Sequence, residues 1–333
     1  MSQTSCGPAQ SLDVQVAATL AAIAYLGKDD DRDPVEQYKL MSAALQASAL
    51  PTAGQWTIVW GPANLKGDLL YIAQGPASGS QEQFAVVIRG TVFTSVYDLT
   101  QDREVGDQDA LPFTAPSGFD GALISRGAEA SWTNLSSAQP VQGVPGSGTA
   151  LSFLQSQGSG FKLLVAGHSL GAQLATVAGV WLAQALSSQS PSLAVIAFAP
   201  PTAGNPQFAD GFAKLFQGTE TALFANQLDI VPRLWDEAGI ESIKQLYPNP
   251  GPHCDLGCDG FVGTAKHLVR KVAYQQPSGI QSLPGQVYDL TGIGRFEDEA
   301  NDQHRELYYM CLVGISVDAI QNIATWSPPG SSS

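Results

Sequence analysis

Residues 167–171 read Gly-His-Ser-Leu-Gly, which matches the pattern G-x-S-x-G. The pattern alone is weak in a chain rich in glycine and serine, so its surroundings decide the interpretation. An apolar run at 163–166 precedes it, and small apolar residues follow at helical spacing. Strand, sharp turn and helix in this order expose a serine hydroxyl at the edge of a sheet. We therefore predict that Ser169 is a nucleophile on a strained turn, with the backbone N–H of Leu170 facing the reacting carbonyl.

A serine nucleophile needs a base, and the base needs a carboxylate that orients it. In this setting the carboxylate follows the serine along the chain and the base comes last. Asp229 lies between Leu228 and Ile230, shortly after a strand predicted at 222–225. A carboxylate among apolar neighbours is costly unless it is hydrogen-bonded, so we predict that Asp229 orients a histidine. The alternative is an aspartate that only caps a loop.

Four histidines are candidates for the base. His304 follows an acidic loop and opens the predicted last helix, a position from which its side chain can reach the edge of the sheet. His253, in a loop rich in proline and cysteine, and His267, in a predicted amphipathic helix, remain alternatives. His168 lies inside the turn, where it cannot face Ser169, and is expected to pack or to hydrogen-bond. The spacing favours His304.

An oxyanion must be stabilised when a serine attacks an ester carbonyl. A strand predicted at 84–88 runs into Arg89-Gly90-Thr91. A backbone N–H here, supported by the hydroxyl of Thr91, could act together with the N–H of Leu170. Thr91 is therefore the oxyanion candidate, and an ordinary turn at the end of a strand is the alternative.

The elements that must position these residues can be predicted from the apolar periodicity and the turn residues. Helices are expected at 12–27, 34–49 and near 121–138, and strands at 56–60, 69–73 and 84–88. A regular alternation follows: strand 162–166, helix 170–187, strand 193–198, helix 206–216 and strand 222–225. This alternation predicts an α/β fold with a mostly parallel central sheet flanked by helices on both faces.

The remainder of the chain is expected to be less regular. Residues 236–300 are rich in glycine and proline, with a possible helix at 263–275, and helical spacing returns at 303–323. The end of the chain, 327–333, is expected to be a disordered tail. We predict one domain over 1–326, in which the long excursion 236–300 could form a second cap over the site.

Composition limits the partners of the protein. Hydrophobic residues make up 44% of the 333 residues and charged residues 14%, and the net charge is −14. Such a surface repels nucleic acid and anionic lipid, but it does not exclude a neutral oil–water interface. The uncharged stretch 163–188 has the length of a membrane span, but a Gly-His-Ser turn breaks it, so no transmembrane segment is expected. No signal peptide is visible, which predicts a cytoplasmic location unless a leader has been removed.

Four cysteines are too few for a disulfide scaffold. A bridge between Cys6 and Cys311 and a tight loop closed by Cys254 and Cys258 are both possible, and the sequence selects neither. Residues 252–259 also contain histidine and aspartate, but no distant second pair of ligands follows. A metal site there is therefore the weaker interpretation.

Several segments, in the right order between about residues 15 and 315, resemble the class 3 (fungal-type) triacylglycerol lipases of the α/β-hydrolase fold. These segments are 88–91 with Ser95, Asp98 and Asp102, then 118–119, 167–172, 199–205 and 229–232, and finally His304. The resemblance implies Ser169 as nucleophile, Asp229 as acid, His304 as base, and Thr91 with Leu170 as the oxyanion hole.

The resemblance also implies a short helical lid after Thr91, at about 92–98. Its apolar residues would face lipid, namely Val92, Phe93, Val96 and Tyr97. Two features depart from the family pattern. Pro116-Ser117 stands where a histidine or a similar residue usually precedes the Gly-Phe pair, and the 75-residue gap between Asp229 and His304 is unusually long.

Together these residues predict a serine carboxylester hydrolase, a lipase that acts on acylglycerols without a cofactor. The same machinery could serve a phospholipase A1, a feruloyl or polyester esterase, or an acyltransferase. A hydrolase-fold protein that binds lipid without catalysis is the alternative from another class. Most of the six tryptophans are expected in the core, and Trp235, close to Asp229, is the candidate for contact with substrate.

Overall fold

The central element of the computed structural model is a sheet of seven strands in the order β1-β2-β3-β6-β7-β8-β9. The structure describes residues 6–27, 33–90, 92, 95–100 and 104–329. The first three strands are antiparallel: β1 (Thr57–Leu65), β2 (Asp68–Ser78) and β3 (Gln81–Arg89). The others run parallel to β3 and to one another: β6 (Lys162–His168), β7 (Ser192–Phe198), β8 (Ala222–Asn226) and β9 (Gln281–Leu283). The predicted α/β fold with a mostly parallel sheet is confirmed.

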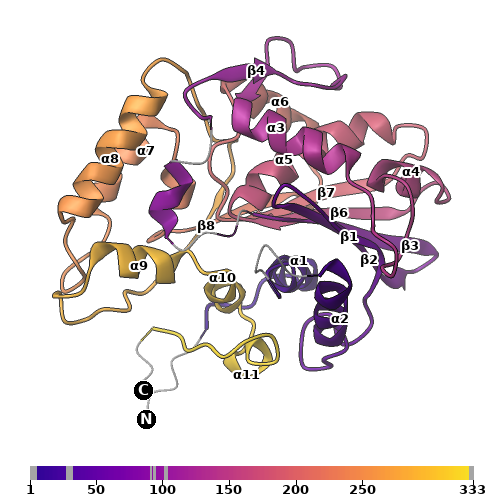
Figure 1. Ribbon diagram of the computed structural model, residues 1–333, viewed down its shortest axis with the longest axis horizontal. Helices are drawn as coiled ribbons and strands as arrows, with labels where there is room; N and C mark the ends of the chain where they lie inside the picture. The colour runs from indigo at the N-terminus through magenta and orange to yellow at the C-terminus, as the bar shows by residue number, and fades with distance from the viewer. Residues whose placement is uncertain (1–5, 28–32, 91, 93–94, 101–103, 330–333) are drawn as a thin grey trace.

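Helices cover both faces of this sheet (Figure 1). One face carries α1 (Leu12–Ile23), α2 (Pro34–Leu45), α10 (Glu306–Leu312) and α11 (Val317–Ile320). The other carries α3 (Arg126–Ser137), α4 (Ala150–Gln155), α5 (Leu170–Ala185) and α6 (Pro206–Leu215). Each face of the sheet packs in its own apolar cluster. Strand β6 is therefore buried on both sides, which explains why its sequence is continuously apolar and does not alternate with polar residues.

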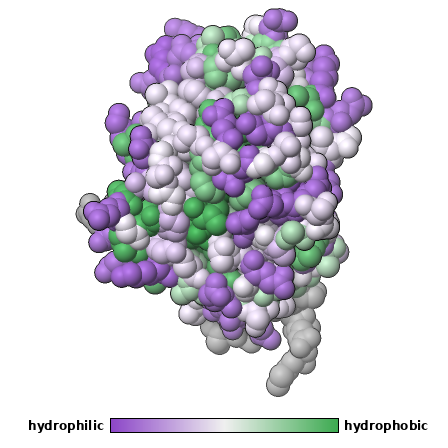
Figure 2. All heavy atoms as spheres, turned by 90° about the vertical axis from the view of Figure 1, so that its right-hand side faces the viewer, coloured by the Kyte–Doolittle hydropathy of each residue, from purple (hydrophilic) through white to green (hydrophobic). Residues whose placement is uncertain are grey.

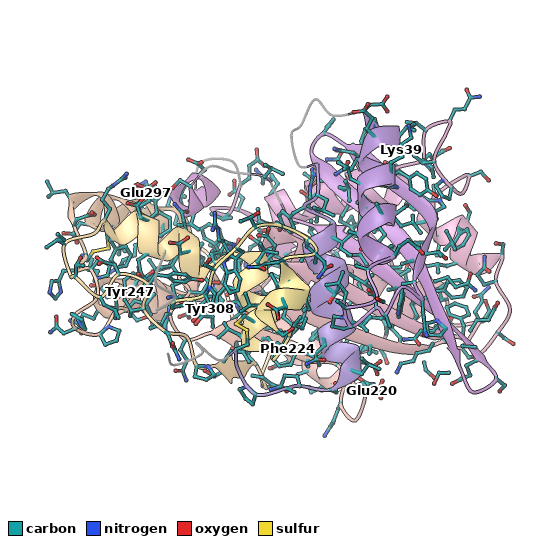
Figure 3. The ribbon with its side chains drawn as sticks, turned by 90° about the horizontal axis from the view of Figure 1, so that it is seen from below. Lys39, Glu220, Phe224, Tyr247, Glu297 and Tyr308 are labelled. Carbon is teal, nitrogen blue, oxygen red and sulfur yellow. A yellow bond between two sulfur atoms is a disulfide. The ribbon has the colours of Figure 1, made fainter. Side chains whose placement is uncertain are left out.

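The excursion 236–300 forms a lobe with more helix than predicted, and the stretch from about 270 to 295, which contains β9 of the central sheet, is irregular as expected. The lobe contains α7 (Glu237–Ser242), η3 (Ile243–Gln245), α8 (Leu256–Val269) and α9 (Phe296–Gln303). A third apolar cluster joins it to Leu170 and to the short helix η1 (Val96–Thr100). Seen from below, Tyr247 and Glu297 lie in the lobe, and Lys39 lies at the other end of the molecule (Figure 3).

Several element boundaries differ from those predicted, and three of these differences have a clear local cause. The first five residues predicted as helix near 121–138 are not helical, because β5 (Leu123–Ser125) pairs with β4 (Gln108–Ala110) there. Helix α8 begins at Leu256 because the side chain of Asp255 accepts a hydrogen bond from the backbone N–H of Cys258. The helix predicted at 303–323 is interrupted at Gly314 (φ +89°), where a Cβ would lie 2.4 Å from Cα of Ala9.

The first and the last described residues lie close together, since Cys6 and Gly7 line one cavity with Pro328 and Pro329. Pro328 and Pro329 are buried, although a disordered tail was expected from 327, and residues 330–333 lie outside the described part of the chain. On the side away from the lobe, apolar residues form small groups between hydrophilic ones (Figure 2). Within the described residues, every helix is too short or too polar to cross a lipid bilayer.

Both cysteine pairs that the sequence left open are disulfides. Cys6 is bonded to Cys311 across 305 residues, and Cys254 to Cys258 across four. The first disulfide joins the N-terminal segment to α10, which is the helix that follows His304. In the chain-entropy account, the long loop restricts the unfolded chain far more than the short one.

We predict that Cys6→Ser/Cys311→Ser lowers the free energy of unfolding by about 2–5 kcal/mol, whereas Cys254→Ser/Cys258→Ser lowers it by about 2 kcal/mol or less. Urea unfolding of the two double variants, followed by circular dichroism, measures the difference. Equal losses, or a larger loss from the short loop, would contradict the chain-entropy account.

Candidate active site

Ser169 lies at the turn between β6 and α5, as the strand–turn–helix pattern predicts. Its backbone has φ 60° and ψ −132°, a conformation that residues other than glycine rarely adopt. The turn can form because Gly167 and Gly171 have no side chain. A Cβ on Gly167 would lie 2.3 Å from the carbonyl oxygen of Gly171, and a Cβ on Gly171 would lie 2.3 Å from that of Ile88. Close packing of β3, β6 and α5 therefore requires both glycines.

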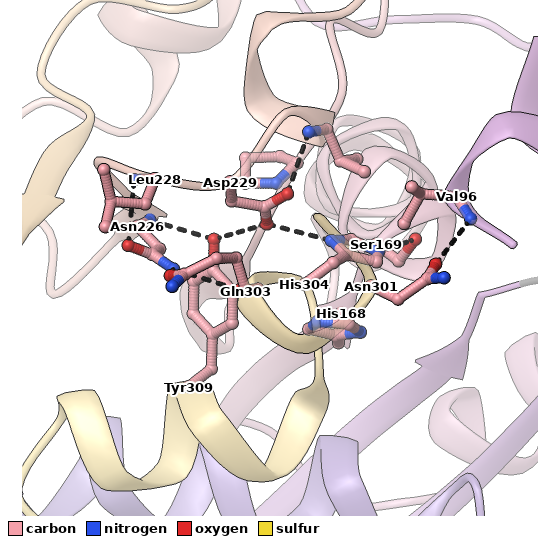
Figure 4. Close-up of polar contacts among 12 residues, drawn as sticks. Val96, His168, Ser169, Asn226, Leu228, Asp229, Asn301, Gln303, His304 and Tyr309 are labelled. Carbon is pink, nitrogen blue, oxygen red and sulfur yellow. Dashed lines mark hydrogen bonds and ion pairs between the residues drawn. The ribbon is translucent and has the colours of Figure 1, made fainter. Parts of the chain in front are cut away.

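The side chains of Ser169, His304 and Asp229 form one continuous chain of hydrogen bonds (Figure 4). Nε2 of His304 lies 2.8 Å from Oγ of Ser169, and Nδ1 of His304 lies 2.8 Å from Oδ2 of Asp229. All three residues are buried. This geometry lets the imidazole accept a proton from the serine while the carboxylate holds the ring in one orientation.

Three different elements bring these side chains together. Asp229 follows β8 at the carboxyl edge of the sheet, and its other oxygen, Oδ1, accepts a hydrogen bond from the backbone N–H of Val231 at 2.9 Å. His304 caps the end of α9, where its backbone N–H donates to the carbonyl of Ala300. The alternative bases, His253 and His267, are exposed residues of the lobe.

Tyr309 completes the arrangement and was not predicted from the sequence. Its hydroxyl donates to Oδ2 of Asp229 at 2.8 Å and accepts a hydrogen bond from the backbone N–H of Asn226 at 2.9 Å (Figure 4). Burial raises the pKa of Tyr309 well above its ordinary value, so the phenol stays protonated and remains a donor. The side chain of Asn226 in turn donates to Oε1 of Gln303 at 2.7 Å, which ties β8 to the residue before His304.

His168 is buried against the imidazole of His304, in the packing role expected from its place in the turn. Its ring centre lies 4.8 Å from that of His304, and the Tyr25 hydroxyl lies 3.2 Å from its Nδ1 and donates to its backbone carbonyl, also at 3.2 Å. Burial, with a smaller contribution from His304, lowers the pKa of His168 well below 6.5. The residue therefore stays neutral and adds no second cation beside the ring that receives the proton of Ser169.

Of the two oxyanion candidates, Leu170 is the first residue of α5, so its backbone N–H has no acceptor within the helix. Thr91 lies outside the described residues. The preceding Gly90 lies close to the nucleophile, since a Cβ on it would lie 2.9 Å from the carbonyl oxygen of His168 and 2.8 Å from the Tyr25 hydroxyl. The end of β3 and the serine turn are thus in direct contact.

Only some of the residues predicted to contact substrate line a cavity at Ser169. Val92 and Val96 line a cavity of about 430 Å³ that reaches Ser169 and His304. The backbone N–H of Val96 donates to Oδ1 of Asn301 at 2.9 Å. Tyr97 stacks on Phe261 of α8, with ring centres 4.6 Å apart, and Phe93 lies outside the described residues.

Trp235 does not line this cavity. Only 1% of its surface is exposed, and it packs in the apolar cluster of the lobe. The expected contact between Trp235 and substrate is therefore wrong for the arrangement described here. The tryptophan instead forms part of the core that joins the lobe to the sheet.

Comparison with known proteins finds a family that resembles part of this chain. Residues 85–238 match the family model of the class 3 lipases, which confirms the resemblance seen in the sequence. The solved structure of M37 lipase is similar to this chain, with 24% identity and a TM-score of 0.80. The match covers 94% of this chain and 97% of the M37 lipase chain. This likeness supports the fold. No protein with curated annotation matches the chain in sequence.

Two fungal structures are less similar. A triacylglycerol lipase from Penicillium expansum has 17% identity and a TM-score of 0.47, and covers 86% of this chain and 84% of its own. A Rhizomucor miehei lipase–propeptide complex has 19% identity and the same TM-score, and covers 69% and 63%. These likenesses are too distant to support a structural argument.

We predict that Tyr309→Phe lowers kcat about tenfold with little change in KM, because Asp229 loses one hydrogen bond and holds His304 less firmly. Tyr308→Phe, a change in the neighbouring tyrosine that has no contact with Asp229 among the described residues, is the matched control. Steady-state hydrolysis of a soluble ester by the two variants measures the difference. An unchanged kcat in Tyr309→Phe would remove its positioning role.

Proposed function

We propose that this chain, whose residues 85–238 match the class 3 lipase model, hydrolyses acylglycerol esters through an acyl-enzyme on Ser169. The observation that carries the proposal is the unbroken chain of hydrogen bonds from Ser169 through His304 to Asp229. A serine hydroxyl is a weak nucleophile unless a base accepts its proton, and this arrangement supplies the base in the correct orientation.

The proposed reaction has two steps. Oγ of Ser169 attacks the ester carbonyl while its proton passes to Nε2 of His304, and Asp229 stabilises the resulting imidazolium. The tetrahedral intermediate collapses, its bond to the alcohol oxygen breaks, and that oxygen takes the proton from His304. Water then attacks the acyl-enzyme with His304 as base, and the fatty acid leaves as Ser169 recovers its proton.

The backbone N–H of Leu170 and residue Thr91 are the proposed donors to the oxyanion. Loss of one such donor costs about 10²–10³ in kcat. The chemistry needs no cofactor, because the protein's own groups perform every proton transfer. Phospholipase A1, feruloyl or polyester esterase and acyltransferase activities would use the same groups, and they differ from a lipase in the substrate that the site accepts.

We predict that Ser169→Ala lowers kcat for p-nitrophenyl butyrate by about 10⁴-fold or more and abolishes labelling by a fluorophosphonate. Asp229→Asn is expected to lower kcat about 10⁴-fold, because His304 loses its orientation. Ser192→Ala, at the exposed opposite end of β7, is the control and should behave as the unchanged protein. If the unchanged protein is neither labelled nor active, the proposed serine hydrolase is wrong.

We further propose that the segment around η1 is a lid over Ser169. Asn301 of α9 holds its backbone at Val96, and Phe261 of α8 holds Tyr97, so two helices of the lobe fix this segment beside the cavity. An acylglycerol would have to displace this segment before its ester group could reach Ser169. Displacement is favoured where the apolar residues of the lid meet an oil surface rather than water.

We predict that Asn301→Ala raises hydrolysis of an ester below its solubility limit about fivefold, because loss of one hydrogen bond favours the open lid. The increase in activity at the solubility limit should shrink accordingly. Asn322→Ala, near the C-terminal end of the chain, is the control. If Asn301→Ala leaves the ratio of the two activities unchanged, this segment does not control access.

A further inference from the structure

One wall of the cavity beside Ser169 is polar, whereas apolar residues such as Val92 and Val96 line another part of it. Asp302 at the end of α9, Arg305, and Glu306 at the start of α10 form the polar wall, and Thr325 adds a hydroxyl. Tyr25 lines the same cavity from α1's side of the molecule. At about 430 Å³ the cavity lies within the size range of small-molecule sites, which is about 300–1,000 Å³.

The charges on this wall have a definite balance. Asp302 and Glu306 contribute two carboxylates, and Arg305 contributes one guanidinium, which lies 3.7 Å from Asp302 and is already paired with it. Burial raises the pKa of Asp302, and Arg305 opposes that effect. At neutral pH the wall therefore carries an excess of one negative charge, and its cation is partly neutralised.

An acyl chain is a poor occupant for the space beside this polar wall. Methylene groups would displace the water that hydrates Asp302 and Glu306 and would offer no hydrogen bond in return. Hydroxyl groups would instead donate to the carboxylates in charge-assisted hydrogen bonds. A phosphate would meet an excess of negative charge and a guanidinium that Asp302 already neutralises.

We propose that this cavity binds the alcohol half of the ester, and that it selects neutral lipids whose alcohol carries free hydroxyl groups, such as partial glycerides or glycosyl diglycerides. This inference rests on the proposed function and names its substrate class. The acyl half would then lie along the apolar part of the same cavity, at Val92 and Val96.

The test compares two soluble esters of one acid, glyceryl monooctanoate and ethyl octanoate, which differ only in the alcohol. We expect kcat/KM of the unchanged protein to be at least about tenfold higher for the glyceryl ester, the gain of one charge-assisted hydrogen bond. Asp302→Asn should reduce this ratio about fivefold, and Asp302→Asn/Glu306→Gln should reduce it about tenfold. Asp298→Asn removes the same charge from α9 outside the cavity and should keep the ratio unchanged.

The outcomes separate this inference from the function on which it rests. If ethyl octanoate is hydrolysed but the glyceryl ester is not preferred, or if Asp302→Asn keeps the ratio, the selective cavity is wrong and the serine hydrolase stands. If neither ester is hydrolysed and Ser169 is not labelled by a fluorophosphonate, the proposed function fails and the inference fails with it.

A second pair of lipids tests the exclusion of phosphate and identifies the source of the hydroxyls. We expect kcat/KM at least about tenfold lower for dioctanoyl phosphatidylglycerol than for galactosyl dioctanoylglycerol, and a smaller gap in Asp302→Asn. A preference for the phospholipid, or for dioctanoyl phosphatidylcholine, would overturn the inference. The hydrolysis of the monoglyceride and that of the galactolipid are then compared in Asp302→Asn. The substrate whose hydrolysis falls more is the one whose hydroxyl groups bind the polar wall better.

Discussion

The structure depends on one imidazole that must reach two partners from opposite sides. His304 can touch both Ser169 and Asp229 only if the ends of β6 and β8 and the turn after α9 meet at one point. Parallel strands satisfy half of this requirement, because their carboxyl ends share one edge of the sheet. The other half falls on the chain between Asp229 and His304, which leaves the sheet, forms the lobe and returns.

Hydrogen bonds on either side of His304 fix the position at which the chain returns from the lobe to the sheet. Asn226 at the end of β8 binds Gln303, and Tyr309 binds both Asn226 and Asp229, so the residues on either side of His304 are tied to the strand that carries the acid. Strand β9 adds a parallel neighbour to β8 within the same excursion. The disulfide between Cys6 and Cys311 fastens the next helix to the N-terminal segment. Each of these contacts restricts the position of the imidazole.

The end of α9 and the start of α10 carry two sets of side chains with different chemistry. His304 hydrogen-bonds to the buried Ser169 and Asp229. Asp302, Arg305 and Glu306 line the polar part of the cavity beside Ser169. In our proposal, this short segment both completes the catalytic group and binds the alcohol half of the substrate.

Local patterns predicted the parts of the protein that local forces determine. The apolar run before Gly167 and the small residues after Gly171 predicted β6, the strained turn and α5, because close packing there admits little else. The excursion 236–300 was expected as a cap with one possible helix, but α7, η3 and α9 were not predicted, since they are short and glycine and proline interrupt the apolar spacing. Tyr309 was not predicted because its role arises from a fold that brings it to Asp229, 80 residues away in the chain.

The central claim concerns the position of one ring relative to one hydroxyl during reaction. A crystal structure of the protein after treatment with an alkyl phosphonate ester would test it most directly. The account predicts phosphorus bonded to Oγ of Ser169, Nε2 of His304 within hydrogen-bonding distance of that linkage, and the phosphoryl oxygen on the backbone N–H of Leu170. Phosphorus on any other residue, or His304 turned away from Ser169, would contradict it.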